Sequence, residues 1–264
     1  MNKVVFLTGA SSGIGKRIFE YLKEKDITVY GASRSLEDSL ELHTFKLDVS
    51  DELAVKNVIE KVIAINSRLD ALINVAGFGI SGAVEDTPTE AIKREIDTNL
   101  FGTIYTIKAA LPHMRTQKEG TIINFSSIAG LVGLPYQAFY STSKFAVEGF
   151  SEALRYEVEQ FGIKVVVIEP GDFKTNFTQR REKYTKENSP YFEKFYNAVT
   201  GMEKDEKAGS NPEIIAELVY KIIQSKNPKH KYLVGPAFEK SFAIVKRILP
   251  ESLTTAIFKW YYGL

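Results

Sequence analysis

Short apolar runs alternate with longer amphipathic stretches along most of the chain. The apolar runs predict buried β-strands at residues 4–8, 28–32, 44–47, 71–75, 121–125, 164–168 and 230–234. The stretches between them carry apolar residues at helical spacing and predict helices at residues 14–25, 51–66, 90–114, 139–161 and 214–225. Uniformly apolar strands separated by helices indicate a parallel sheet with helices on both faces. Because the connections are short and show no domain boundary, we expect a single doubly wound α/β domain over residues 1–264.

One long connection departs from this alternation. Residues 174–209 are polar, charged and aromatic and show no strand pattern. A connection of this length inside a compact domain is more often functional than featureless. We therefore expect a lid-like insertion over residues 174–209.

The C-terminal tail, residues 237–264, is amphipathic. Its apolar positions fall on one helical face before Pro250 interrupts the pattern, at Phe238, Phe242, Val245, Ile248 and Leu249. Basic side chains lie between them, at Lys240, Lys246 and Arg247. Such a stripe can pack on the body, close over a substrate, form a dimer or lie on a membrane surface, and packing is the favoured interpretation.

Composition and charge exclude several classes of protein. Hydrophobic residues make up 44% of the 264 residues and charged residues 25%, as in ordinary globular proteins. The net charge of +1 gives no basic excess of the kind that nucleic-acid binding needs. The chain has no cysteine, and its three histidines lie far apart, so no metal site is expected. With no predicted signal peptide or membrane span, we expect a soluble, cytoplasmic protein.

A glycine-rich turn joins the first predicted strand to the first helix. Glycines here let the backbone approach a pyrophosphate, and free N–H groups at the start of a helix attract its oxygens. A tight strand-to-helix turn without a ligand is the alternative interpretation. The position of the turn favours a dinucleotide site formed by Gly9, Ser11, Ser12, Gly13, Ile14 and Gly15.

The end of the second predicted strand indicates which dinucleotide binds. NAD sites place a carboxylate there for the ribose 2′-hydroxyl, whereas an arginine accommodates the 2′-phosphate of NADP. This chain has Ser33 and Arg34 and no carboxylate before Glu37. A solvent-exposed arginine without a ligand is the alternative, but the missing acid favours NADP(H) as the cofactor.

At this point the sequence resembles the short-chain dehydrogenase/reductase family over nearly its whole length, most strongly over residues 3–177. Besides the glycine turn, the resemblance rests on motif positions in the family's order and spacing: Asp48, Val49, Asn74, Ala76, Gly77, Asn99, Ser127, Tyr140, Lys144, Pro170, Gly171 and Thr175. The family more often has asparagine where this chain has Val75. The resemblance implies a Rossmann fold, an oxidoreductase acting on a carbonyl/alcohol pair, and a homodimer or homotetramer.

The spacing of Tyr140 and Lys144 has chemical meaning of its own. Residues four apart share one face of a helix. A cation held close to a phenol favours the phenolate, so we expect the pKa of Tyr140 to lie below its ordinary value, near the range useful for acid–base catalysis. Tyr140 would then protonate the carbonyl oxygen during reduction. Each residue alone could be structural.

The resemblance implies further roles. Ser127 orients the substrate oxygen, Asn99 holds a water that links Lys144 to solvent, and Lys144 also binds the nicotinamide ribose. The cofactor-binding set is completed around the adenine and the nicotinamide by Asp48, Val49, Asn74, Ala76, Gly77, Tyr140, Pro170, Gly171 and Thr175. Asp48 alternatively caps the helix that begins near Asp51.

The residues just beyond these motifs indicate the substrate class. They are largely apolar and comprise Phe78, Ile80, Leu131, Leu134, Pro135, Phe173 and Phe177. We expect a hydrophobic ketone, aldehyde or alcohol as the substrate. The tail resembles those of enzymes similar to 17β-hydroxysteroid and retinol dehydrogenases.

An NADP(H)-binding redox sensor with little turnover is the alternative function. Membrane contact through the tail is a minor alternative. The sequence leaves open the physiological substrate, its stereochemistry and the preferred direction.

Overall fold

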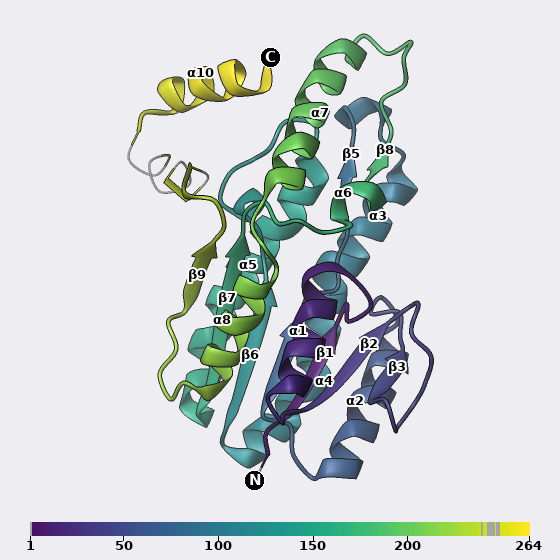
Figure 1. The fold of residues 1–264 in the computed structure, drawn as a ribbon, viewed down its shortest axis with the longest axis vertical. Helices are drawn as coiled ribbons and strands as arrows, with labels where there is room; N and C mark the ends of the chain where they lie inside the picture. Colours follow the sequence, from purple (N-terminus) through teal and green to yellow (C-terminus); the bar gives the residue numbers. More distant parts are fainter. Residues whose placement is uncertain (1, 239, 242–245, 247–248) are drawn as a thin grey trace.

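A seven-stranded parallel sheet forms the centre of the molecule (Figure 1). The computed structural model describes residues 2–238, 240–241, 246 and 249–264. Strand order is β3-β2-β1-β4-β6-β7-β9. The strands are β1 (Val4–Thr8), β2 (Thr28–Ser33), β3 (Thr44–Lys46), β4 (Ala71–Asn74), β6 (Gly120–Phe125), β7 (Ile163–Pro170) and β9 (Lys231–Val234). The order reverses between β1 and β4, the switch point at which doubly wound folds bind ligands.

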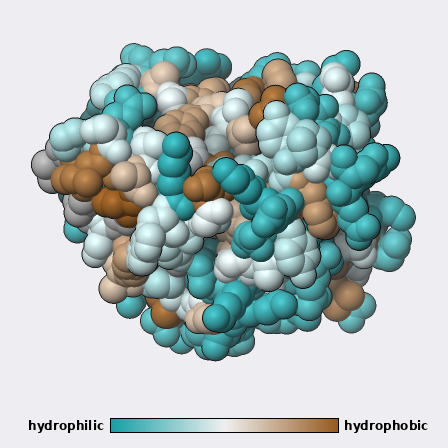
Figure 2. Space-filling view, turned by 90° about the horizontal axis from the view of Figure 1, so that it is seen from above, coloured by the Kyte–Doolittle hydropathy of each residue, from teal (hydrophilic) through white to brown (hydrophobic). Residues whose placement is uncertain are grey.

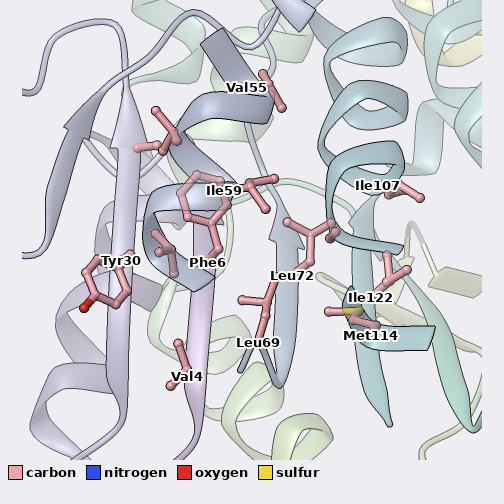
Figure 3. Close-up of a cluster of buried hydrophobic side chains, with 14 of the residues drawn as sticks. Val4, Phe6, Tyr30, Val55, Ile59, Leu69, Leu72, Ile107, Met114 and Ile122 are labelled. Carbon is pink, nitrogen blue, oxygen red and sulfur yellow. The ribbon is translucent and has the colours of Figure 1, made fainter. Parts of the chain in front are cut away.

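Helices cover both faces of the sheet, which is why the strands are apolar on both sides. One face carries α1 (Gly13–Glu24) and α8 (Glu213–Gln224). The other carries α2 (Glu52–Asn66), α4 (Gly102–Gln117) and α5 (Ala138–Val158). Figure 3 shows the core on this second face, where Phe6 and Leu72 from the sheet meet Ile59 of α2 and Ile107 of α4. The expected α/β doubly wound fold is confirmed.

The predicted helix over residues 90–114 is interrupted in the structure. It consists of α3 (Thr89–Ile96), one π-helical turn over Asp97–Phe101, and α4. Periodicity alone does not reveal this turn because the apolar pattern continues through it. Wider π turns often occur at functional sites, and this one carries Asn99.

The prediction that residues 174–209 contain no strand is wrong. They form α6 (Phe177–Arg180), the two-residue strand β8 (Glu182–Lys183) and α7 (Phe192–Ala208). β8 pairs in parallel with β5 (Ile80–Ser81), a strand that the sequence did not indicate. Two residues are too few to show an alternating pattern, so pairing of this kind depends on tertiary contacts.

The C-terminal tail is described in part. The predicted apolar face at Phe242, Val245 and Ile248 lies outside the described residues. After Pro250, the helix α10 (Glu251–Tyr262) lies beside α7, and the Tyr261 hydroxyl hydrogen-bonds Asp205 of α7 at 2.6 Å (Figure 1). Among the described residues, none of the helices has both the length and the apolar character required to cross a membrane.

Candidate active site

A cavity of about 770 Å³ opens at the carboxyl ends of the parallel strands. Its size falls within the range of small-molecule and cofactor sites. The structure brings most of the predicted site residues into its wall, namely Gly9, Ser11, Ser12, Gly13, Ile14, Gly15, Ser33, Arg34, Asp48, Val49, Ala76, Gly77, Ser127, Tyr140, Lys144, Pro170, Gly171 and Thr175. Asn74 and Asn99 are the exceptions.

The glycine turn is held in a geometry that larger residues cannot adopt. Gly9 has φ +77°, and a Cβ there would lie 2.9 Å from the backbone nitrogen of Ala76. A Cβ on Gly15 would lie 2.2 Å from the carbonyl oxygen of Gly9. The first turn of α1 therefore packs directly on the end of β1, and the backbone N–H groups at its start line the cavity.

The β2 and β3 ends supply the next part of the wall. Arg34 is exposed and forms no salt bridge with any residue that the structure describes. Asp48 accepts hydrogen bonds from the backbone and hydroxyl of Ser50. The proposed capping role of Asp48 is wrong, because Asp51 caps α2 by accepting from the Ala54 N–H.

Asn74 does not face the cavity. Its amide nitrogen donates to Asn124 at 3.0 Å, and its amide oxygen accepts from the Thr106 hydroxyl at 2.7 Å. Asn124 in turn donates to Ser151 of α5. The side chain therefore joins β4 to β6 and α4 and does not line the cavity, and a contact between Asn74 and the cofactor stays a prediction. Alternate residues of a strand point to opposite faces, and resemblance alone does not say which face carries the ligand.

Asn99 is buried beneath the cavity wall at the π turn. Its amide accepts from the Phe78 N–H at 3.0 Å and donates to the Phe78 carbonyl and to the Ser143 hydroxyl. The side chain thus holds the loop after β4 against α5. Asn99 and Lys144 both border Gly77. A Cβ on Gly77 would lie 2.9 Å from the Asn99 Oδ1 and 3.7 Å from the Lys144 Nζ, so the relation between the two side chains is indirect.

Tyr140, Lys144 and Ser127 meet at the centre of the cavity. Tyr140 and Lys144 lie one turn apart on α5, with the Lys144 Nζ 5.6 Å from the centre of the Tyr140 ring. Lys144 donates to the carbonyl of Phe125 at the end of β6. The Ser127 hydroxyl accepts from the Ala129 N–H, which fixes its position next to Tyr140.

The expected lowering of the Tyr140 pKa is wrong for this structure. Burial raises the pKa of the phenol well above its ordinary value, a hydrogen bond with Ser127 opposes the rise, and the Glu95 carboxylate adds to it. Burial also lowers the pKa of Lys144 to about 8, and the carboxylates of Glu95 and Glu148 partly oppose this. Desolvation is the largest cause of both shifts because both groups are buried.

The strand end after β7 completes the site. Pro170, Gly171 and Thr175 line the cavity opposite the glycine turn. A Cβ on Gly13 would lie 3.3 Å from the Thr175 Cβ, so the two segments approach closely. The Thr175 hydroxyl also accepts from the Phe177 N–H at the start of α6.

The predicted apolar lining is partly right. Phe78, Leu134, Phe173 and Phe177 line the cavity. Leu131, Pro135 and Ile80 do not line it, and Ile80 is buried in β5.

The view onto this end of the molecule shows apolar side chains gathered at the left, the side on which α10 lies (Figure 2). Ile257, Phe258, Tyr261 and Tyr262 of α10 add to the cavity wall.

Sequence reasoning missed several charged residues around this cavity. Arg180 donates to the Ser12 hydroxyl at 2.7 Å and so reaches over the glycine turn. Glu95 is fully buried and accepts from the Ile80 N–H, and burial raises its pKa to about 8. Arg181 and Glu206 form a buried ion pair in the wall. None belongs to a local motif, so only the tertiary structure brings them to the site.

Comparison with known proteins agrees with this geometry. The sequence profile of the family described as short chain dehydrogenase matches residues 3–186. The chain is 40% identical to a 3-ketodihydrosphingosine reductase of Bacteroides thetaiotaomicron, covering 99% of this chain and 98% of that protein. It is 31% identical to an NADPH-dependent 3-dehydrocapnine reductase of Ornithobacterium rhinotracheale, covering 96% of this chain and 94% of the relative.

A solved structure shows the same fold. A short-chain dehydrogenase from Streptomyces avermitilis matches with a TM-score of 0.84 at 28% identity, over 98% of this chain and 97% of that one. The chain belongs to the short-chain dehydrogenase family. It is therefore an oxidoreductase acting on a carbonyl/alcohol pair, and the family resemblance seen in the sequence is confirmed.

Replacing Gly15 with alanine tests the glycine turn. The new Cβ would meet the Gly9 carbonyl at 2.2 Å, so the turn has to open and its N–H groups move away from the phosphate position. We expect Gly15→Ala to weaken NADPH binding at least about tenfold, about the value of one lost charge-assisted hydrogen bond. Titration of NADPH fluorescence measures this.

Gly149→Ala is the matched control, because a Cβ on this α5 glycine meets nothing within 4 Å. It should bind NADPH as the unmodified protein does. Equal affinity in the Gly15→Ala and Gly149→Ala variants would contradict the assignment of the turn.

Proposed function

We propose that this protein is an NADPH-dependent reductase of a long-chain lipid ketone, with the carbonyl at carbon 3 next to an amino-bearing carbon, as in sphingoid bases. The observation that carries the proposal is the full-length similarity to two reductases whose names specify a 3-keto and a 3-dehydro lipid. A large cavity that combines a catalytic centre with apolar walls supports it. Neither relative's name specifies a steroid or a retinoid, so a sphingoid-type substrate takes the place of that hypothesis.

The residues around the glycine turn fit NADP(H). Arg34 stands in the cavity wall at the end of β2, unpaired among the residues that the structure describes, where a 2′-phosphate would lie. Its guanidinium can bind two phosphate oxygens at once. The 3-dehydrocapnine reductase is NADPH-dependent by name, which favours the same cofactor here. When bound, the reduced nicotinamide supplies the hydride.

The protein's own groups manage the proton. Tyr140 stays protonated over the physiological range because burial raises its pKa, so it can donate its proton to the carbonyl oxygen as charge develops there. Ser127 lies beside the phenol and hydrogen-bonds the same oxygen. Lys144 stabilises the phenolate that proton donation leaves behind, provided that its ammonium is charged.

Residues 174–209 and α10 enclose the substrate in this proposal. Phe177 of α6 contacts Tyr140, with ring centres 5.7 Å apart. Tyr261 ties α10 to α7 through Asp205, so both helices border one cavity. The apolar residues of α10 would then contact a long hydrocarbon chain rather than solvent.

Replacement of the Tyr140 hydroxyl tests its role as the acid. We expect Tyr140→Phe to reduce kcat about 10²- to 10⁴-fold, the usual contribution of a general acid, because Ser127 hydrogen-bonds the carbonyl oxygen but does not give up its proton. NADPH affinity should change little, since the ring remains in place. Tyr136→Phe is the control, because Tyr136 lies two residues before α5 and does not line the cavity. Turnover in Tyr140→Phe equal to that of Tyr136→Phe would remove the assignment.

The Lys144 charge predicts the pH dependence. Below about pH 8 the ammonium is charged, and above it the charge is lost. We therefore expect kcat/KM for NADPH to be level at low pH and to fall as pH rises through 8. Because the Glu95 carboxylate raises the pKa of Lys144, Glu95→Gln should move this decline to lower pH. A decline that stays in place, or an activity that rises through pH 8, would contradict the prediction.

The proposed function is tested by following NADPH and NADH oxidation with purified protein. The substrate panel contains a long-chain 2-amino-3-ketone, a plain long-chain 3-ketone, a steroid ketone, retinal and a small polar aldehyde. We expect the highest kcat/KM with the long-chain ketones and a preference for NADPH that Arg34→Ala abolishes. Turnover confined to small polar carbonyls would overturn the lipid assignment, and NADPH binding without any turnover would favour a sensor.

A further inference from the structure

A buried ion pair lies beside the catalytic centre. Arg181 follows α6, and Glu206 lies in the last turn of α7. Their side chains are 1% and 13% exposed, and the Arg181 Nη2 donates to the Glu206 Oε1. The Thr178 hydroxyl donates to the other oxygen of Glu206. The carboxylate is thus well satisfied, and all three residues line the cavity.

The guanidinium is not satisfied. The Nε and Nη1 atoms of Arg181 are buried and have no hydrogen-bond partner among the described residues. Buried donors without an acceptor are costly, and those of a charged group most of all. The Phe177 ring lies 5.5 Å from the Arg181 Cζ but offers only its π face. The guanidinium therefore has two N–H directions for which the described residues offer no oxygen acceptor.

One aromatic ring contacts both the ion pair and Tyr140. The Phe177 ring contacts both Arg181 and Tyr140, with its centre 5.5 Å from the Cζ of Arg181 and 5.7 Å from the Tyr140 ring centre. The charges of Arg181 and Glu206 act on the Tyr140 phenol in opposite directions, Arg181 lowering its pKa and Glu206 raising it. The Phe177 ring therefore connects the pair to the catalytic tyrosine within the wall of one cavity.

Apolar side chains from two segments form another part of the cavity wall. Val132 and Leu134 follow β6, and Ile257 and Phe258 come from α10. The cavity therefore offers both the charged pair of Arg181 and Glu206 and an apolar region at these four side chains. A substrate with a polar head and a hydrocarbon tail matches this division, since its head finds partners in the corner and its tail displaces water from the wall.

We propose that Arg181 and Glu206 form a head-group subsite that recognises an amino-alcohol head on the substrate ketone. An unpartnered N–H group of Arg181 donates to the head-group hydroxyl oxygen, and Glu206 accepts from the ammonium. The pair of Arg181 and Glu206 has a net charge of zero, so it suits a head group that carries both a hydrogen-bond donor and an acceptor. A head group with only a negative charge would be repelled by Glu206. This subsite rests on the proposed function and specifies how the enzyme would distinguish a sphingoid-type ketone from a plain one.

The test compares two substrates of equal chain length, a 2-amino-1-hydroxy-3-ketone and the plain 3-ketone. The Arg181→Met/Glu206→Met variant replaces the pair with apolar side chains of similar volume, a change that folded proteins often tolerate. We expect the ratio of kcat/KM for the polar-headed to the plain ketone to fall about 30-fold, in keeping with loss of hydrogen bonds to a charged group. Arg181→Lys keeps the positive charge but lacks the planar guanidinium with its several N–H donors. It should therefore also lower the ratio of kcat/KM for the polar-headed to the plain ketone.

The Lys183→Met/Glu203→Met variant is the matched control. It removes a second ion pair between β8 and α7, and neither residue lines the cavity. Its ratio should equal that of the unmodified protein. Equal losses on both ketones in the Arg181→Met/Glu206→Met variant, or no loss, would overturn the subsite.

The unmodified protein separates failure of the subsite from failure of the proposed function. If it reduces both long-chain ketones equally well, the head-group subsite is overturned and the reductase assignment stands. If it reduces neither of them while reducing other carbonyls, the proposed function itself is overturned, and the subsite with it.

Discussion

All strands of the central sheet run in the same direction, and the candidate site depends on this constraint. The register places Thr8, Asn74 and Asn124 side by side at the ends of β1, β4 and β6. The Thr8 hydroxyl accepts from the N–H groups of Val75 and Ala76, which anchors the loop after β4 to the glycine turn. Segments far apart in the sequence thereby share one edge, where their loops enclose a single cavity.

Burial at this edge controls the chemistry. Tyr140 and Lys144 lie within the protein, so desolvation raises the pKa of the phenol and lowers that of the ammonium. The buried Glu95 faces both groups and opposes the loss of charge on Lys144. A buried phenol of this kind keeps its proton, as the role proposed for Tyr140 in carbonyl reduction requires. The positive charge needed to stabilise the phenolate is then sensitive to pH near 8.

The sequence predicted those features that are encoded locally. Strand and helix positions follow from apolar periodicity, and Tyr140 and Lys144 share a helix face because they are four residues apart. The orientation of Asn74 depends on which neighbours its strand acquires, and the pKa of Tyr140 depends on burial, so neither could be read from spacing. Arg181 and Glu206 come together only because α6 packs on α7.

The cavity thus joins the glycine turn, the buried Tyr140, the Arg181–Glu206 pair and the apolar side chains of α10. The central claim is that the chain transfers a hydride from NADPH to a long-chain lipid ketone. The most direct test supplies NADPH carrying deuterium at both C4 positions together with the long-chain 2-amino-3-ketone, and analyses the product by mass spectrometry. The account predicts an alcohol with one deuterium on carbon 3. Unchanged ketone, or an alcohol without deuterium, would contradict it.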